Sequence, residues 1–126
     1  MFLTIDTTDP RPIYQQVADG IKELIAQGKL AEGAVLPPVR QLAADLGVNL
    51  NTIAAAYHEL QKDGLIVVKH GSGSVVAERA NTERSSDELV RPLRTAITEL
   101  VLAGLPTSKI MRMVARELSL VQKESK

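Results

Sequence analysis

The sequence predicts a mainly α-helical fold with one small β-hairpin, in a chain of 126 residues. Over most of the chain, apolar residues recur at spacings of three and four, the periodicity of helices that bury one face. Only one short region is rich in β-branched residues, and a glycine-containing turn divides it into two halves. The aromatic residues are Phe2, Tyr14 and Tyr57, so the core must be built from aliphatic side chains, which suits packed helices.

The first two helices are expected on either side of a proline pair. The first lies between Pro10 and Gly28, and its apolar face is carried by Ile13, Val17, Ile21, Leu24 and Ile25. The second is short, follows Pro37 and Pro38, and ends at Gly47. Proline near the first turn and glycine at the carboxyl end are typical of such a helix.

The third helix is expected to start in the stretch GVNLNTIAAAY and to end at Gly64. Asn49 can accept a hydrogen bond from an unpaired N–H of the first turn. The inward-facing residues are Ile53, Ala56, Tyr57 and Leu60. Two short helices joined by a tight turn resemble a helix-turn-helix, whose second helix lies in the major groove of DNA. The alternative is a capped structural helix, in which the asparagines serve the turn and the alanines serve helix propensity.

A β-hairpin is expected directly after the third helix. LIVVK, at Leu65–Lys69, and SVVA, at Ser74–Ala77, are its strands, and HGSG supplies the turn residues. A glycine-rich turn at this place resembles the wing of a winged helix, because glycine lets the backbone approach a groove or a phosphate closely. The alternative is a plain hairpin loop.

The remainder of the chain predicts a linker and two further helices. The stretch ERANTERSSD lacks apolar periodicity, so residues 78–88 are assigned to a linker between a domain at 1–77 and a segment at 89–126. Ser85 and Glu88 can form a capping box for the next helix. The two helices are expected at about Leu89–Ala103 and Thr107–Gln122. Pro92 either kinks the first of them or marks its true start.

The two carboxyl-terminal helices carry apolar stripes that predict a dimer. The stripe residues expected to pair between chains are Leu93, Ile97, Leu100, Val101, Ile110, Val114 and Leu118. A short appendage beyond a polar linker has little of its own domain to bury these stripes against. The alternative is that both helices pack back on the core of the same chain.

Composition excludes several classes of function. Fifteen basic residues balance fifteen acidic ones, cysteine is absent, and there are two histidines, so neither a metal site nor a cofactor site is expected. No Ser-His-Asp set or glycine-rich phosphate loop is present, which argues against an enzyme. No apolar run approaches a membrane span and no basic and apolar leader follows Met1, so the sequence predicts a cytoplasmic protein that does not contact membranes.

The run LPPVRQLAADLGVNLNTIAAAYHELQKDGLIVVKHGSGSVVA, preceded by PIYQQV, resembles the DNA-binding domain of the GntR family of bacterial transcription regulators. The resemblance covers residues 12–77, and the spacing of its motifs is far more selective than a bare helix-turn-helix. The N-x-N-T pattern from Asn49 to Thr52, the PIYQQ opening and the short remainder are similar to the YtrA-like subgroup. That resemblance implies a winged helix-turn-helix followed by a two-helix dimerisation segment.

The resemblance also implies which side chains reach DNA. The candidate contact residues are Arg40, Asn49, Leu50, Asn51, Thr52, His58, Lys69, His70, Gly71 and Ser72. Arg40 matches the family arginine that reaches DNA, although an ion pair with Asp45 or Glu32 is the alternative for this side chain. Leu50 and Ala54 depart from many family members, which carry arginine at these positions, so the resemblance does not carry an operator preference over to this sequence.

These observations together predict a homodimeric transcription regulator, acting as a repressor, that binds a roughly two-fold symmetric operator in double-stranded DNA. No cofactor is expected, and the sequence does not identify an effector. The domain at 1–77 holds six basic and eight acidic residues, so binding must depend on a few placed side chains rather than on a broad positive field. The alternative function is a winged-helix module for protein or RNA contacts.

Overall fold

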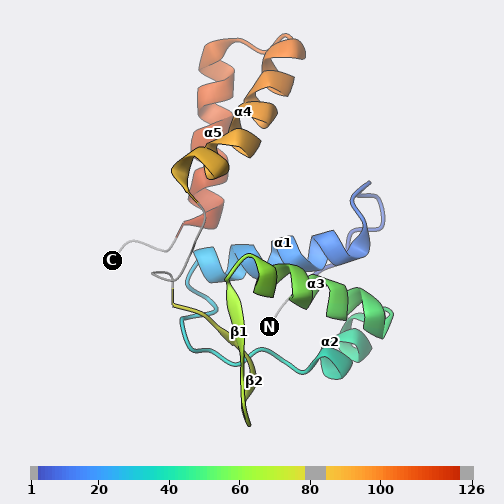
Figure 1. The fold of residues 1–126 in the computed structure, drawn as a ribbon. Helices are drawn as coiled ribbons and strands as arrows, with labels where there is room; N and C mark the ends of the chain where they lie inside the picture. The colour runs from blue at the N-terminus through green and yellow to red at the C-terminus, as the bar shows by residue number, and fades with distance from the viewer. Residues whose placement is uncertain (1–2, 79–84, 123–126) are drawn as a thin grey trace. The chain divides into compact units, whose positions relative to one another are not determined.

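The computed structural model describes residues 3–78 and 85–122, which belong to two compact units. The first unit contains α1 (Ile13–Ala26), α2 (Val39–Leu46), α3 (Leu50–Lys62), β1 (Ile66–Lys69) and β2 (Gly73–Val76). The second contains α4 (Ser86–Leu102) and α5 (Thr107–Val121). The prediction of a mainly helical fold with a single hairpin is therefore confirmed (Figure 1).

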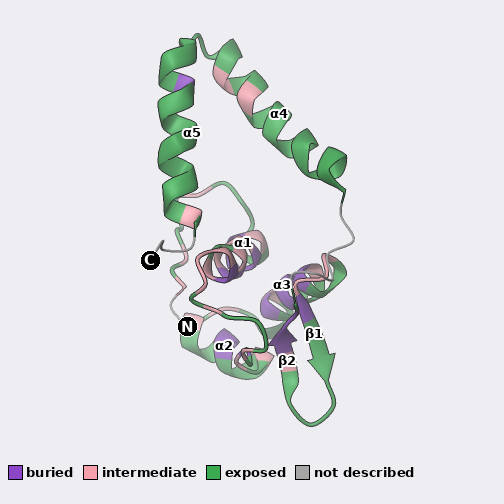
Figure 2. Ribbon diagram, turned by 90° about the vertical axis from the view of Figure 1, so that its left-hand side faces the viewer, coloured by how far each residue is buried: buried purple, intermediate pink, exposed green. Residues whose placement is uncertain are grey.

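The core of the first unit lies between the three helices and the base of the hairpin. It is aliphatic apart from Tyr57, and its members are Val17, Ala18, Ile21, Ile25, Leu36, Leu42, Ala43, Ile53, Ala56, Tyr57, Leu60, Ile66 and Val76. Figure 2 shows buried segments on α1, α2, α3 and the base of the hairpin, and Leu36 adds to the core from the segment before α2. The helical spacing of three and four produces this arrangement, because it places the apolar residues of each helix on one face.

A buried glutamine fastens the amino-terminal segment to α1. Gln16 is only 8% exposed, and its side-chain oxygen accepts a hydrogen bond from the Asp6 N–H at 2.9 Å. Its amide nitrogen donates to the carbonyl oxygens of Asp6 and Arg11, both at 3.1 Å. All the polar atoms of this side chain are therefore paired, which is the condition under which a buried amide is tolerated.

The hairpin pairs β1 with β2 in antiparallel register, from Ile66 opposite Val76 to Lys69 opposite Gly73. The segment before α2 lies along the other edge of β2. There the Leu36 N–H donates to the Ser74 carbonyl oxygen at 2.9 Å, and a bridge joins Val35 to Val75. At its base β2 is thus flanked on both sides, by β1 and by the segment before α2, which leaves the turn as the projecting part of the hairpin.

The second unit begins with the capping residue that the sequence predicts. The Ser85 side chain accepts a hydrogen bond from the Glu88 N–H at 3.2 Å, and α4 starts at Ser86. The predicted linker therefore ends too late, because residues 86–88 are helical; its residues 79–84 lie outside the described part of the chain. Pro92 lies inside α4, six residues after the first, so the alternative that it marks the start of the helix is wrong.

Candidate nucleic-acid interface

The turn between α2 and α3 is fixed by one glycine and one asparagine. Gly47 adopts the left-handed conformation, with φ of 68°, and the Val48 N–H after it donates to the Ala43 carbonyl oxygen at 3.0 Å. Glycine occupies this region without steric cost. The Asn49 side chain accepts a hydrogen bond from the Asn51 N–H at 2.7 Å, so Asn49 is the amino-terminal cap of α3, in agreement with the sequence.

A buried tyrosine sets the position of α3 relative to the segment before α2. The Tyr57 hydroxyl donates to the Pro37 carbonyl oxygen at 2.6 Å, and the residue is only 6% exposed. Burial raises the pKa of Tyr57 to about 12, because the charged phenolate is disfavoured away from water. Tyr57 therefore remains a protonated donor throughout the neutral range.

One face of α3 is exposed, and it carries small and polar side chains. Its residues are Leu50, Asn51, Ala54, Ala55, His58, Gln61 and Lys62. The opposite face is buried in the core through Ile53 and Tyr57. Asn51 and His58 are seven residues apart, which is two helical turns, so both lie on the exposed face. No hydrogen-bond partner is present for either side chain within the described residues.

Thr52 and Asn51 project in different directions, although both are candidate contact residues. Successive helical residues are rotated by about 100°, and Thr52 is half-buried whereas Asn51 is exposed. Thr52 therefore lies at the border of the exposed face, towards the side of the helix. A residue in this place suits a backbone contact better than a base contact.

Arg40 is the second residue of α2, and its side chain is exposed. In the described part of the chain it forms no ion pair, so neither Asp45 nor Glu32 engages it. The guanidinium group is therefore available to a phosphate or a base edge. The alternative that Arg40 serves an internal ion pair is wrong for this structure.

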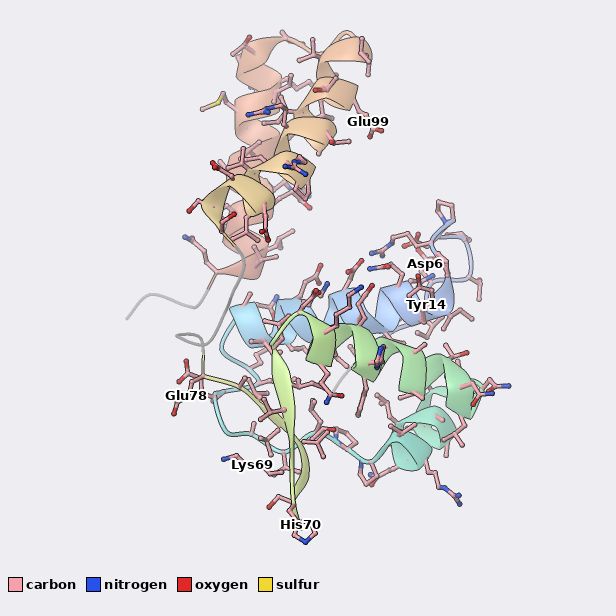
Figure 3. The ribbon with its side chains drawn as sticks, viewed as in Figure 1. Asp6, Tyr14, Lys69, His70, Glu78 and Glu99 are labelled. Carbon is pink, nitrogen blue, oxygen red and sulfur yellow. The ribbon has the colours of Figure 1, made fainter. Side chains whose placement is uncertain are left out.

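The turn of the hairpin places four candidate residues together in solvent. Lys69, His70, Gly71 and Ser72 are all exposed, and Figure 3 shows His70 at the tip. Gly71 has φ of 83°, and a Cβ atom built on it would meet no other atom within 4 Å. The glycine thus serves the backbone conformation and leaves the tip open to an approaching surface.

Some basic side chains of the first unit are engaged in ion pairs within the chain, and others are available to contact a polyanion. Arg11 is paired with Asp9 and Asp19, and its hydrogen bonds hold the pKa of Asp9 below the ordinary value. Lys22 of α1 is paired with Asp63 at 3.2 Å, beyond the end of α3. Three other cations lie on α2, α3 and the hairpin and form no ion pair among the described residues; these are Arg40, Lys62 and Lys69.

Lys62 and the two exposed alanines were not among the contact residues expected from the sequence. Lys62 follows His58 by four residues, and Ala54 and Ala55 lie between Asn51 and His58. Helical periodicity measured from Asn51 would have placed all three on the same face. The sequence therefore contained enough information to include Lys62, Ala54 and Ala55 on the exposed face.

The residues expected to form the dimer contact lie in the second unit with different exposures. Ile110 is buried, while Ile97 and Leu100 are intermediate. The remaining four are 38–57% exposed, and these are Leu93, Val101, Val114 and Leu118. Figure 2 shows α4 and α5 as almost entirely exposed. Much apolar surface of the second unit is therefore in contact with solvent.

Two other classes of site are absent from the described part of the chain. Within residues 3–78 and 85–122, no three His, Asp or Glu side chains are grouped so that they could hold a metal ion. None of the helices in these ranges is long and apolar enough to cross a membrane.

The chain was compared with known families and proteins. The family model "Bacterial regulatory proteins, gntR family" matches residues 13–76. The transcriptional repressor YtrA of Bacillus subtilis is 32% identical over 120 residues, which are 93% of this chain and 92% of that protein. The similarity to YtrA therefore continues beyond the winged domain.

Two solved structures resemble the fold of this chain, and one of them is a complex with DNA. A transcriptional antiterminator from Listeria monocytogenes has 28% identity and a TM-score of 0.88, with 100% of this chain and 97% of that chain covered. AraR(DBD) in complex with operator ORX1 has 31% identity and a TM-score of 0.52, with 61% and 93% covered. Because the family model matches half of the chain and the YtrA repressor matches nearly all of it, this protein belongs to the GntR family, as a YtrA-like DNA-binding transcription regulator.

Proposed function

We propose that the protein acts as a homodimeric repressor in the cytoplasm, with one winged domain on each half of a roughly two-fold symmetric DNA operator. The observation that carries the dimer is the exposed apolar surface of the second unit. Leu93 and Leu118 are each 50% exposed and Val101 is 57% exposed, although these residues belong to the apolar stripes of α4 and α5. Pairing with a second copy would remove this surface from water.

On each half-site, the exposed face of α3 would enter the major groove. Asn51 is suited to adenine, because its amide can donate to and accept from the same base edge. Arg40 and Lys62 would contact the phosphate backbone beside the groove, and Lys69 and His70 would bring the wing to the neighbouring backbone. A free winged domain would hold too few contacts for tight binding, and two linked domains add theirs.

Repression, rather than activation, is supported by the likeness to the Bacillus subtilis repressor, which extends over 93% of this chain. The matched family consists of bacterial regulatory proteins and YtrA is a transcriptional repressor, which supports DNA binding rather than catalysis as the activity. A repressor acts by occupying DNA that the transcription machinery needs. The operator affinity of the dimer is therefore the quantity on which this function depends.

A second candidate function is contact with RNA or with another protein. The Listeria monocytogenes protein that resembles the whole chain is described as a transcriptional antiterminator, and the overall charge of this chain is zero. Salt dependence separates the candidates, because duplex binding through phosphates weakens steeply as salt rises. Competition between duplex DNA and RNA of the same sequence separates them further.

The experiment combines a duplex selected by the full-length protein with a matched pair of variants. Val101 lies on the apolar face of α4 together with Ile97, whereas the neighbouring Leu102 is rotated away by about 100° and is 81% exposed. Val101→Glu should yield monomers in analytical ultracentrifugation and lower operator affinity at least tenfold. Leu102→Glu, which introduces the same charge next to it, should remain a dimer with unchanged affinity.

Three outcomes would contradict the proposal. If the unmodified protein sediments as a monomer at micromolar concentration, the proposed dimer is wrong. The Val101→Glu variant could remain dimeric, which would place the interface elsewhere. If the protein binds no DNA duplex, DNA is not its partner, and binding to RNA would then favour the second candidate function.

A further inference from the structure

The exposed face of α3 begins with a leucine that the fold does not bury. Leu50 is the first residue of α3, directly after the cap Asn49, and it is 42% exposed. The other large aliphatic residues of this helix, Ile53 and Leu60, are fully buried. Leu50 therefore keeps apolar surface in water at the end of the helix that leads into the proposed DNA groove.

Ala54 continues the apolar surface of Leu50 by one helical turn. The two residues are four positions apart, which places them on the same face, and both are exposed. Asn51 lies beside them on the same exposed face, one residue after Leu50 and three before Ala54, and its backbone N–H is already paired with the cap. With Ala55, the first two turns of the exposed face thus present three apolar groups and one amide, and no cation.

This set of side chains restricts which base edges it can contact favourably. Guanine presents two acceptors in the major groove and is usually read by arginine or lysine, neither of which lies between Leu50 and His58. Thymine presents a methyl group, the one apolar group on a base edge of the major groove. Adenine presents an acceptor and a donor, which the amide of Asn51 can match.

We propose that Leu50 and Ala54 contact thymine methyl groups, so that α3 reads a half-site of A·T pairs with Asn51 on an adenine beside the methyl contacts. The inference rests on the proposed function, since it needs α3 in the major groove. It specifies which bases α3 discriminates and by which group. Each buried methyl contact is worth about fourfold in affinity, or about 0.8 kcal/mol for one carbon removed from water.

The position of α3 within its domain is fixed by contacts that do not involve the side chains of Leu50 and Ala54. The cap at Asn49, the turn at Gly47 and the hydrogen bond from Tyr57 to Pro37 determine where Leu50 lies. None of these contacts uses the side chain of Leu50 or Ala54. Both side chains can therefore be changed without moving the helix, which makes the proposal testable by substitution.

The test uses duplexes that the full-length protein selects from a randomised library, followed by replacement of single thymines with deoxyuridine. Deoxyuridine keeps the hydrogen-bonding edge of thymine and lacks only the methyl group. At one or two positions of each half-site, the replacement should weaken binding about fourfold. In the Leu50→Ala variant, the effect should vanish at one of these positions, because the shortened side chain loses the carbons that would contact the methyl group.

The control variant is Ile13→Ala, which removes an aliphatic side chain of similar exposure from the start of α1. Ile13 is 41% exposed, compared with 42% for Leu50, and it lies outside α3 and the wing. This variant should keep both the operator affinity and the full sensitivity to deoxyuridine. Thermal unfolding of each variant shows whether the fold is intact, and the deoxyuridine scan of the unmodified protein does not depend on any variant.

The outcomes separate this inference from the proposed function. Binding to a selected duplex that is indifferent to deoxyuridine at every position would overturn the methyl contacts and leave the operator intact. Selection of half-sites built from G·C pairs alone would do the same. Failure to select any duplex would overturn the proposed function and this inference together.

Discussion

The Tyr57 hydroxyl donates a hydrogen bond to the Pro37 carbonyl oxygen at 2.6 Å, and this contact joins α3 to the segment that leads into α2. The two residues are separated by 20 positions, and the tyrosine ring is buried in the core. The bond therefore determines how the two helices of the helix-turn-helix meet. Its loss would leave a carbonyl oxygen without its partner.

Tyr57→Phe is expected to lower the free energy of unfolding by about 1 kcal/mol, because it removes a buried hydrogen bond and keeps the ring. Chemical denaturation measures this difference. Tyr14→Phe is the control, since Tyr14 is 37% exposed and its hydroxyl makes no hydrogen bond within the described residues, so its stability should not change. Equal effects of the two substitutions would assign no energetic role to the contact with Pro37.

The raised pKa of Tyr57, about 12 in the folded protein, predicts a loss of stability in alkaline solution. The ordinary value is 10.0, so the unfolded state releases the proton first. The contribution of Tyr57 is fully present below about pH 10 and is lost as the pH rises from 10 to 12. Unfolding free energies measured across this window should fall more steeply for the unmodified protein than for Tyr57→Phe. Parallel curves would contradict the assignment.

Asn49 and Asn51 are two residues apart, and alanine should lower stability at the first and operator affinity at the second. Asn49→Ala removes the cap and should lower stability by about 1 kcal/mol. Asn51→Ala leaves the cap in place, because its backbone N–H is the donor, and should lower operator affinity by about 1–3 kcal/mol with stability unchanged. Denaturation and fluorescence anisotropy on one preparation measure both quantities. Unchanged operator affinity in Asn51→Ala would contradict the placement of α3 in the major groove.

Gly71→Ala should weaken operator binding, because the positive φ of 83° disfavours any side chain and the wing tip would change its conformation. Gly33→Ala is a matched control, since Gly33 has φ of 82° and open space around a Cβ atom but lies away from the tip. Both variants should lose about 1 kcal/mol of stability, and only Gly71→Ala should lose affinity as well. Full affinity in Gly71→Ala would mean that the wing does not touch DNA.

Arg40→Ala should weaken binding to all duplexes alike and reduce the slope of log affinity against log salt by about 1, which is the signature of one lost phosphate contact. Lys29→Ala is the control, because Lys29 is also exposed and without an ion pair in the described structure but lies after α1. It should leave the slope unchanged. A loss of discrimination at one base pair would instead assign Arg40 to base contact.

Much of the helix-turn-helix could be predicted from the sequence because its signals are local. The cap at Asn49, the glycine after α2 and the buried stripe from Ile53 to Leu60 all act within a few residues, and each is present in the structure. The family resemblance rests on the same short-range motifs. Interactions within one turn of a helix depend on the nearby sequence alone, so a single sequence reveals them.

Interactions between distant residues were decided by the tertiary structure. Nothing in the periodicity around Val35 indicates that it would pair with Val75, or that Gln16 would be buried between Asp6 and Arg11. Pro92 suggested a helix boundary that the structure does not have, since α4 starts six residues earlier, after the cap at Ser85. Helical periodicity alone indicates which residues of α3 face the core, whereas the partial burial of Thr52 and the exposure of Leu50 at the border of that face follow from packing. The sequence by itself thus determined most of the elements and the family. The pairings between distant residues, and the exposure of each side chain at the border of α3, depend on how the elements pack together, which only the tertiary structure sets.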